Sequence, residues 1–330
     1  MRRKLHKILV TGGAGFIGSE FVKRAVRRSY EIVVVDKLTY AGDLDRLGES
    51  RGQIEFYKGD ICDAHVMSKI LKKEKPAVIV NFAAETHVDR SIVNSSPFIE
   101  TNIKGTRNLL DLALKFKTPR YIQISTDEVY GDIRRGSFAE DSPFKPNSPY
   151  AASKAAADLL IGAYMRTYKL PAVIVRPSNN YGPWQYPEKL IPLVTLMASK
   201  NKKVPVYARG ENIREWLYVS DCAEAIIEVM ERGRLGQVYN MGSGQEKRNI
   251  EVVKLILRFL GKPESLIKFV TDRPGHDFRY SLNCNKIRKE LGWRAIVRFE
   301  NGLKNTVNWL ASNQDWIDKH AGKKLSIKFK

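Results

Sequence analysis

The chain has 330 residues, of which 43% are hydrophobic and 28% are charged, and its formal net charge is +20. This length and composition are typical of an ordered globular protein with a sizeable core, and they exclude a repeat architecture or a largely disordered chain. The basic residues form short runs at 2–7, 69–75 and 319–330 that flank or cover ordinary amphipathic segments. We expect solvated surface there and no nucleic-acid partner, because no recognition module accompanies the charge.

Strands and helices alternate through the first half of the chain. Short β-branched or apolar runs indicate the strands, and segments with apolar residues at helical spacing lie between them. The expected strands are residues 7–11, 31–36, 54–60, 77–84, 120–125 and 171–177, and the expected helices are 16–28, 64–74, 97–116 and 148–168. This alternation predicts an α/β fold with a Rossmann-type, doubly wound parallel sheet whose sites lie at the carboxyl ends of the strands.

The alternation weakens from about residue 178, and the loops there become richer in Pro, Asn and Arg. We interpret residues 1–177 as a dinucleotide-binding domain that also carries the catalytic residues. Residues 178–330 are expected to form mainly a smaller C-terminal lobe that binds the substrate, with some segments returning to the first domain.

A glycine-rich loop follows the first expected strand and opens the first expected helix. Gly12, Gly15 and Gly18 stand in TGGAGFIG, the spacing of the short-chain dehydrogenase variant of the Rossmann turn. Such a loop lets a pyrophosphate approach the backbone, and the helix N-terminus stabilises its charge. Asp36 ends the second strand, where it would accept hydrogen bonds from the adenosine ribose and repel a 2′-phosphate. The expected cofactor is therefore NAD rather than NADP.

Tyr150 and Lys154 lie four residues apart in PYAASKAAAD and hence on one face of a helix. A nearby ammonium and the positive charge of a nicotinamide would lower the pKa of the tyrosine, so that its phenolate acts as a general base near neutral pH. Lys154 would also hold the nicotinamide ribose. The segment ISTDEV ends a strand just upstream and adds the side chains of Thr126, Asp127 and Glu128.

Seven motifs resemble, in order and spacing, the dTDP-glucose 4,6-dehydratases, an NAD-dependent nucleotide-sugar family of the extended short-chain dehydrogenases. They span about residues 7–295 and are TGGAGFIGS, FAAETHVDRSI, STDEVYGD, SPYAASKA, NNYGPWQYPEKLIP, NIREWLYV and TDRPGHD. The adjacent Asp and Glu of STDE are the specific part of the resemblance. Related sugar epimerases and decarboxylases share the glycines and the Tyr-Lys pair but generally lack this acidic pair.

The resemblance implies dehydration of dTDP-glucose to dTDP-4-keto-6-deoxyglucose by internal redox, in deoxysugar biosynthesis. Tyr150 would take the proton of the 4-hydroxyl while NAD takes a hydride, and Thr126 would hydrogen-bond the 4-oxygen. Glu128 would then remove the C5 proton, protonated Asp127 would give a proton to the departing 6-hydroxyl, and the hydride would return to C6. Because adjacent strand residues point to opposite faces, the strand must end before these carboxyls. NAD is regenerated at each turnover, so we expect it to be tightly held.

The resemblance also implies which residues hold the two ligands. For NAD they are Gly12, Gly15, Phe16, Ile17, Gly18, Asp36, Lys37, Thr39, Asp60, Ile61, Ala83, Ala84, Thr101, Tyr150, Lys154 and Asn180. For the nucleotide sugar they are Thr86, Thr126, Asn179, Lys189, Leu190, Pro205, Tyr207, Arg214, Asn249, Arg273 and His276. The two arginines are expected on the pyrophosphate, because a guanidinium donates paired hydrogen bonds. No metal is expected, since His87 and His276 have no clustered ligands around them.

Several alternatives stay open at this stage. UDP or another nucleotide is not excluded by the base-reading positions, and a 4-epimerase or a decarboxylase has the same fold. A non-catalytic NAD-binding protein or an RNA-binding protein is a more distant alternative. The sequence departs from the family pattern at Cys222, where many relatives have histidine, and shows no usable resemblance after residue 295.

Assembly and location are the last expectations. A homodimer is expected through the helices at 97–116 and 148–168, although packing on the sheet also explains the apolar residues of the first helix, Ile103, Leu109, Leu112 and Phe116. The cysteines Cys62, Cys222 and Cys284 are odd in number and far apart, which is unlike a disulfide framework. The apolar run after the basic start is too short for a signal peptide, and no segment has the length of a membrane span. We expect a cytoplasmic protein without a membrane partner.

Overall fold

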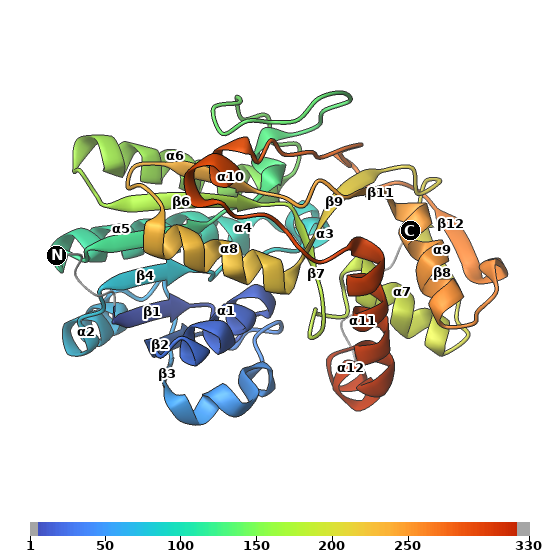
Figure 1. The fold of residues 1–330 in the computed structure, drawn as a ribbon, viewed down its shortest axis with the longest axis horizontal. Coiled ribbons are helices and arrows are strands. Elements are labelled where there is room, and N and C mark those ends of the chain that lie inside the picture. The colour runs from blue at the N-terminus through green and yellow to red at the C-terminus, as the bar shows by residue number, and fades with distance from the viewer. Residues whose placement is uncertain (1–5, 322–330) are drawn as a thin grey trace.

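The structure, a computed structural model, describes residues 6–321, so most of the first and last basic runs lie outside it. Its centre is a seven-stranded sheet in the order β10-β6-β5-β4-β1-β2-β3 (Figure 1). All neighbouring strands in it are parallel. The strands are β1 (Lys7–Thr11), β2 (Glu31–Asp36), β3 (Ile54–Lys58), β4 (Val78–Asn81), β5 (Arg120–Ile124), β6 (Ala172–Pro177) and β10 (Val238–Met241). The predicted doubly wound α/β fold is confirmed.

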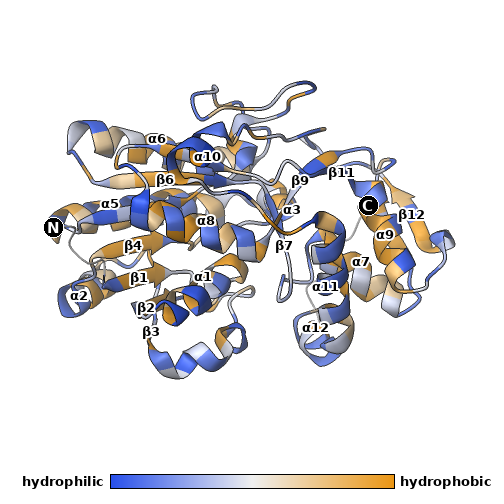
Figure 2. Cartoon of the chain, in the orientation of Figure 1, coloured by the Kyte–Doolittle hydropathy of each residue, from blue (hydrophilic) through white to orange (hydrophobic). Residues whose placement is uncertain are grey.

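Helices cover both faces of this sheet. One face packs against α1 (Phe16–Arg27), α8 (Val219–Arg232) and α10 (Asn285–Leu291), and the other against α2 (Ala64–Glu74), α5 (Thr106–Lys115) and α6 (Pro149–Thr167). Within β1, Ile8 and Val10 enter the first core, whereas Leu9 enters the second. A strand buried on both faces must be apolar at every position, which explains the continuous hydrophobic runs (Figure 2).

The helix predicted over 97–116 is not uniform. It comprises α4 (Ser96–Phe98), a π-helical segment η2 (Ile99–Gly105) and α5. In η2, Asn102 accepts from the backbone of Glu85 at 2.9 Å and donates to the hydroxyl of Ser153 at 2.8 Å. Wide helical turns of this kind are frequent at functional sites. The sequence also missed α3 (Val88–Val93) and the 3-10 segment η1 (Leu44–Gln53), both of which lack a long apolar periodicity.

The second half of the chain builds a separate, smaller core. It contains α7 (Leu190–Ser199), α9 (Asn249–Phe259), α11 (Phe299–Ser312) and α12 (Gln314–Ala321). Two small sheets accompany it, one of β8 (Val204–Tyr207) and β12 (Ile267–Val270), the other of β7 (Asn179–Tyr181), β9 (Ile213–Tyr218) and β11 (Glu246–Arg248). Short 3-10 turns are η3 (Asp127–Tyr130) and η4 (Glu264–Leu266). Because β10 belongs to the large sheet and α8 and α10 pack on it, the chain crosses between the lobes more than once; a boundary at residue 177 stays a prediction.

All three cysteines are free, and Cys222 and Cys284 are buried in the core of the large sheet. Between residues 6 and 321, no helix has both the length and the apolar character needed to cross a membrane. In the same part of the chain, no group of three or more His, Cys, Asp or Glu side chains gathers as a metal site would require.

A buried ion pair joins α6 to the sheet. The Arg176 Nε atom lies 2.9 Å from Asp158 Oδ2, and the two side chains are 4% and 1% exposed. Arg176 also donates to the Tyr130 hydroxyl at 2.6 Å. Removing one partner of such a pair leaves the other charge buried without compensation, which costs far more than the pair itself contributes.

Asp158→Ala should therefore lower the free energy of unfolding by about 3–5 kcal/mol, the usual cost of leaving a buried partner charge unpaired. The matched control is Glu228→Ala, which breaks the more exposed ion pair with Arg232 and should cost about 0.5 kcal/mol or less. Urea denaturation of the two variants measures both values. Equal effects would show that the buried pair does not fix α6.

Candidate active site

The glycine-rich loop after β1 packs so closely that side chains cannot be accommodated. Gly12 has a φ of +69°, and a Cβ atom on it would lie 2.6 Å from the backbone nitrogen of Ala83. A Cβ atom on Gly18 would overlap the carbonyl oxygen of Gly12. The first residues of α1 thus stay close to the turn, with the helix N-terminus open at the carboxyl edge of the sheet. This is the backbone cradle that a dinucleotide pyrophosphate requires.

Asp36 braces this loop. Its carboxylate accepts hydrogen bonds from the backbone N–H of Ala14 at 2.9 Å and of Leu38 at 2.8 Å. Burial raises the pKa of Asp36, while these two bonds oppose that rise. Each carboxylate oxygen has a second lone pair, so contact with a ribose remains compatible with the geometry and stays a prediction.

The other residues expected at NAD follow the strand ends. Asp60 and Ile61 come after β3, and Ala83 and Ala84 come after β4. Lys37 forms an ion pair of 2.6 Å with Asp60. Phe16 and Ile17 begin α1, Thr39 follows β2, Thr101 lies in η2, and Asn180 lies in β7. The carboxyl ends of parallel strands share one edge, so the donor set fits an NAD-sized ligand laid across the switch point between β1 and β4.

The acidic pair lies where β5 has ended, as the sequence predicted. After Ile124 the chain turns into η3, whose N-terminal cap is Thr126. The Thr126 hydroxyl accepts from the backbone N–H of Glu128 at 3.3 Å and donates to Asp127 Oδ1 at 3.2 Å. Because the backbone is helical rather than extended, adjacent carboxyl groups are not forced to opposite faces of a sheet.

Burial sets the protonation of the two carboxyl groups. It raises the pKa of Asp127 well above its usual value, and the negative charges of Glu128 and Glu215 raise it further. These effects favour the protonated, neutral form of Asp127. Burial also raises the pKa of Glu128, but the charges of Arg273, Arg214 and Lys189 oppose the rise. Paired carboxyl groups in unequal environments can take the separate roles of proton donor and proton acceptor.

Tyr150 and Lys154 lie on α6 as expected, and the lowered pKa expected for the tyrosine beside a bound nicotinamide stays a prediction. Burial raises the pKa of Tyr150 above its usual range, the charge of Glu128 adds to this, and a hydrogen bond with Thr126 lowers it. Burial lowers the pKa of Lys154 to about 8. The lysine Nζ donates to the carbonyl of Ile124 at 2.6 Å. The phenol is thus kept protonated by burial and by the neighbouring carboxyl groups.

A cavity between the lobes collects nearly all residues expected at the nucleotide sugar. Its lining contains Glu128 and every expected sugar-nucleotide residue except Thr126, namely Thr86, Asn179, Lys189, Leu190, Pro205, Tyr207, Arg214, Asn249, Arg273 and His276. These residues come from distant parts of the sequence, so the fold brings one predicted set together. Which ligand atoms each contacts stays a prediction.

Several polar atoms of the cavity wall have no partner within the chain. They are buried and make no hydrogen bond: Oδ1 of Asn179, Asn180 and Asn249, and Nε of Arg273. Buried donors and acceptors in native proteins are rarely left unpaired without a ligand or water to serve them. The cavity therefore suits a strongly polar, anionic molecule, since Arg214, Arg273 and Lys189 also face the site.

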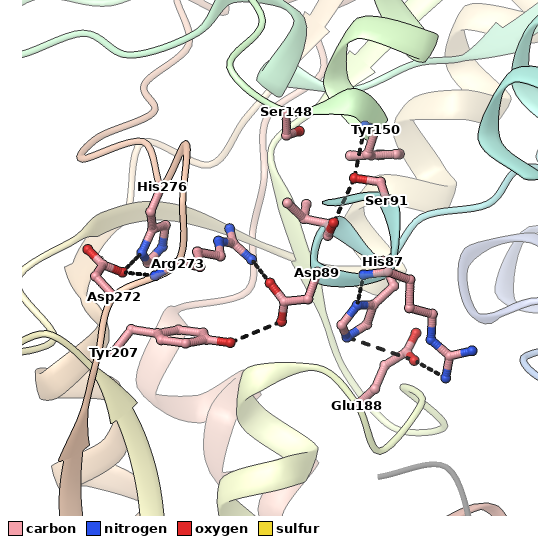
Figure 3. Close-up of polar contacts among 12 residues, drawn as sticks. His87, Asp89, Ser91, Ser148, Tyr150, Glu188, Tyr207, Asp272, Arg273 and His276 are labelled. Atoms are coloured by element: carbon pink, nitrogen blue, oxygen red, sulfur yellow. Dashed lines mark hydrogen bonds and ion pairs between the residues drawn. The ribbon is translucent and has the colours of Figure 1, made fainter. Parts of the chain in front are cut away.

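Sequence reasoning missed Asp89, which links the two lobes at this cavity. Its carboxylate accepts from Arg273 at 3.0 Å and from the Tyr207 hydroxyl at 3.1 Å (Figure 3). Asp89 lies in α3, inside the motif FAAETHVDRSI, so its place in a family motif could have marked it. Its partners could not be predicted, because they lie 118 and 184 residues away.

Two histidines and a glutamate complete the wall. Burial lowers the pKa of His87 to about 3 and that of His276 to about 4, so both are neutral at pH 7. His87 Nδ1 accepts from the backbone N–H of Arg90 at 3.3 Å, and His276 Nδ1 lies 2.6 Å from Asp272 (Figure 3). Glu188, another residue that the sequence missed, pairs with Arg90 at 3.1 Å. These contacts hold the imidazole rings of His87 and His276 in place in the cavity wall.

Comparisons with known proteins identify the family of the chain. The family model described as GDP-mannose 4,6 dehydratase matches residues 9–306. A dTDP-glucose 4,6-dehydratase of Xanthomonas campestris pv. campestris (strain B100) is 47% identical, with 94% of each chain covered. The Escherichia coli dTDP-glucose 4,6-dehydratase is 44% identical over 97% of this chain and 99% of its own. This chain belongs to the dTDP-glucose 4,6-dehydratase family.

Solved structures of family members are similar to this chain in fold. DesIV, the dTDP-glucose 4,6-dehydratase of Streptomyces venezuelae solved with NAD and TYD bound, is 46% identical and superposes with a TM-score of 0.92, covering 95% of this chain and 99% of its own. A UDP-glucose 4-epimerase of Thermotoga maritima is 29% identical and has a TM-score of 0.88, covering 93% of this chain and 99% of its own. The fold alone therefore does not separate the dehydratase family from the epimerases.

The close packing of the glycine loop gives a test of the NAD site. Gly18→Ala should weaken NAD binding by roughly one to two orders of magnitude, because the new methyl must push the loop away from Gly12 at an overpacking cost of about 1–3 kcal/mol. Calorimetric titration with NAD measures the affinity. The control is Gly52→Ala, where the methyl meets nothing within 4 Å and the affinity should not change. Wild-type affinity in the Gly18 variant would contradict the site.

Proposed function

We propose that this chain dehydrates dTDP-glucose to dTDP-4-keto-6-deoxyglucose by internal redox, as a step of deoxysugar biosynthesis. The observation that carries the proposal is the acidic pair at the end of β5. Glu128 lines the cavity beside three cationic side chains, and Asp127 next to it is buried, with a pKa raised well above its usual value. A simple epimerisation at C4 needs neither group, whereas loss of water across C5 and C6 needs both a base and an acid.

The chemistry that NAD would supply when bound is uptake of a hydride from C4 of the sugar and its return to C6, with a positive charge on the oxidised nicotinamide. The residues proposed to hold it are the glycine loop, Asp36 and the strand-end residues. Since no net reductant is consumed, the cofactor is expected to remain bound between turnovers.

The proton transfers are assigned to the chain's own side chains. Tyr150 takes the proton of the 4-hydroxyl, and Thr126 donates a hydrogen bond to the 4-oxygen. The resulting ketone acidifies the C5 hydrogen, which Glu128 removes as a general base. Asp127 gives its proton to the departing 6-hydroxyl, so that water rather than hydroxide leaves. When the hydride returns to C6, Glu128 returns a proton, exchanged with solvent, to C5, and the proton that Tyr150 took balances the one that Asp127 gave. Burial and neighbouring carboxyl groups favour the protonated form of Asp127, whereas cationic side chains oppose the rise in pKa at Glu128.

Lys154 has a positioning part in this scheme. Its ammonium is anchored on the carbonyl of Ile124, the last residue of β5, and lies near the negative charge of Asp158. It would hold the nicotinamide ribose and fix the position of α6 relative to β5, the strand that ends just before the acidic pair.

The arginines of the cavity are proposed to bind the pyrophosphate. Arg214 is held by the carbonyl oxygens of Ile213, Phe278 and Asp277 at 2.7–3.2 Å, so its guanidinium has a fixed orientation. Arg273 has its Nε unpaired. A planar guanidinium that is already oriented loses little entropy when it binds an anion. The named relatives support dTDP as the nucleotide.

We also propose a cytoplasmic homodimer that pairs through α5 and α6. Leu159 and Tyr168 at α6 are 61% and 57% exposed, and Ile99 in the neighbouring η2 is 50% exposed. Large apolar side chains that gather at the surface are typical of interfaces. Pairing of these helices would cover them.

The reaction can be followed with substrate labelled by deuterium at C4. Purified protein given dTDP-glucose and no reductant should form a 4-keto-6-deoxy sugar that carries the label at C6 and one solvent hydrogen at C5, because the hydride never leaves the site. Mass spectrometry and NMR locate the label. UDP-glucose labelled in the same way tests the nucleotide. In the control Tyr150→Phe the label should stay at C4. A product that is only the C4 epimer would contradict the dehydratase.

The acidic pair gives a second test. The double variant Asp127→Asn and Glu128→Gln should oxidise C4 but lose water at least about 100-fold more slowly, since general acid–base catalysis commonly contributes 10²–10⁴-fold. Reduced cofactor should then accumulate and be visible by its absorbance. Each single variant shows which proton transfer is limiting. Normal turnover by the double variant would remove the acidic pair from the mechanism.

A further inference from the structure

The last described helix, α12, reaches across to the dinucleotide-binding half of the chain. The indole Nε1 of Trp316 donates to Asp43 Oδ2 at 2.6 Å, and His320 Nε2 lies 3.2 Å from the same oxygen. Asp43 and Trp316 are each 8% exposed. This buried, charge-assisted contact joins residues 273 positions apart, and neither Asp43 nor Trp316 lies in any of the seven sequence motifs.

Asp43 is in turn attached to the glycine loop. Its backbone N–H donates to the carbonyl of Ala14 at 3.0 Å, and Arg46 donates to the same carbonyl at 3.1 Å. The N–H of Ala14 is held by Asp36. Both peptide groups of Ala14 are therefore fixed, and α12 is two contacts away from the loop that would bind the pyrophosphate.

Arg46 ties the same region together from within. Its side chain is 1% exposed, and its guanidinium carbon lies 5.3 Å from the centroid of the Trp316 ring. It donates to the carbonyl of Trp184 at 3.0 Å and also to that of Ala41. A fully buried guanidinium needs such acceptors, and it must lose several of them if the loop moves outward.

The same two residues of α12 also contact the segment at 184–186, which belongs to the second half of the chain. Trp184 packs against Trp316 with ring centroids 5.3 Å apart, and the Tyr186 hydroxyl donates to the carbonyl of His320 at 3.2 Å. The segment with these aromatic residues leads directly into Glu188 and Lys189 of the cavity wall. One short helix thus contacts both the segment that holds the glycine-rich loop and the segment that leads into the cavity wall.

We propose that α12 is a clasp: it keeps NAD in its site between turnovers by holding the glycine-rich loop at Ala14 through Asp43 and Arg46. The inference rests on the proposed NAD site and adds to it a set of positioning residues that do not themselves contact the reacting atoms. Release of a buried dinucleotide requires local opening of the loops around it, and that opening must break the contacts of α12. Fixing the loop in its binding conformation also lowers the entropy lost on binding.

The test uses the full-length holoprotein and the variant Trp316→Phe, which removes the indole N–H but keeps an aromatic ring. Bound NAD is exchanged for radiolabelled NAD without substrate, and the exchange rate is measured by rapid filtration. We expect exchange to be about tenfold faster, the effect of losing one charge-assisted hydrogen bond that holds the closed state. Turnover of dTDP-glucose should recover when free NAD is added at saturation.

The matched control is Trp309→Phe. Trp309 belongs to the same aromatic group, with its ring centroid 5.5 Å from that of Trp316, so this variant perturbs packing while the bond from Trp316 to Asp43 remains. Melting temperatures of both variants record any general loss of stability. Faster exchange in Trp316→Phe alone supports the clasp, and equal exchange rates in the two variants overturn it.

A second variant serves if Trp316→Phe does not fold. Asp43→Asn keeps an oxygen that accepts from the indole but removes the negative charge that faces His320 and Arg46, and it should also release NAD faster. Unchanged exchange would refute the clasp alone. A wild-type protein that binds no NAD at all would instead refute the proposed function, and the clasp with it.

Discussion

Four ionisable groups, of which Asp127, Tyr150 and Lys154 are buried and Glu128 is half-buried, lie where a single strand of the large sheet ends, and the chemistry of the chain depends on that burial. Water around Asp127, Glu128, Tyr150 and Lys154 would return each to its ordinary pKa, and no division of roles would follow. Without water, the charged form of each group is penalised, and only neighbouring charges decide how strongly. The cationic side chains near Glu128 oppose the penalty there, whereas Asp127 is next to further carboxyl groups. The acid and the base are therefore distinguished by their surroundings and not by residue type.

The fold supplies this burial through the geometry of a doubly wound sheet. Helices on both faces exclude water from the strands, so polar groups can gather only at the carboxyl edge, where backbone hydrogen bonding between strands stops. At that edge β5 presents the carbonyl of Ile124 to Lys154, and the chain then turns at Thr126. The buried pair of Arg176 and Asp158 fixes α6 just behind. Catalytic groups from one turn and one helix are thus held in register by ordinary structural contacts.

Much of this was predictable from the sequence, because the relevant signals are local. The apolar runs predicted the strands to within a few residues, and the glycine spacing predicted the tight turn between β1 and α1. The adjacent Asp and Glu predicted that the strand ends before them. What the sequence could not predict depends on long-range pairing. Asp89 meets residues of the other lobe, and Trp316 meets Asp43, across separations that carry no periodicity. The rise that burial causes in the pKa of Tyr150 was also not predictable, because the extent of burial around a residue is a property of the assembled fold.

The similarity to a UDP-glucose 4-epimerase, with 29% identity and a TM-score of 0.88, shows where the reaction must be decided. Chains of nearly the same shape can share the cofactor loop and the Tyr-Lys pair, since both reactions begin by oxidising a sugar hydroxyl. After that step an epimerase needs only to present the other face of the ketone. A dehydratase must move two further protons, one from carbon and one to oxygen, and a single buried carboxyl group cannot be both charged for the first and protonated for the second. Two adjacent carboxyl groups with pKa values displaced to different extents meet that requirement, and the turn after β5 is what allows neighbours in sequence to serve one site.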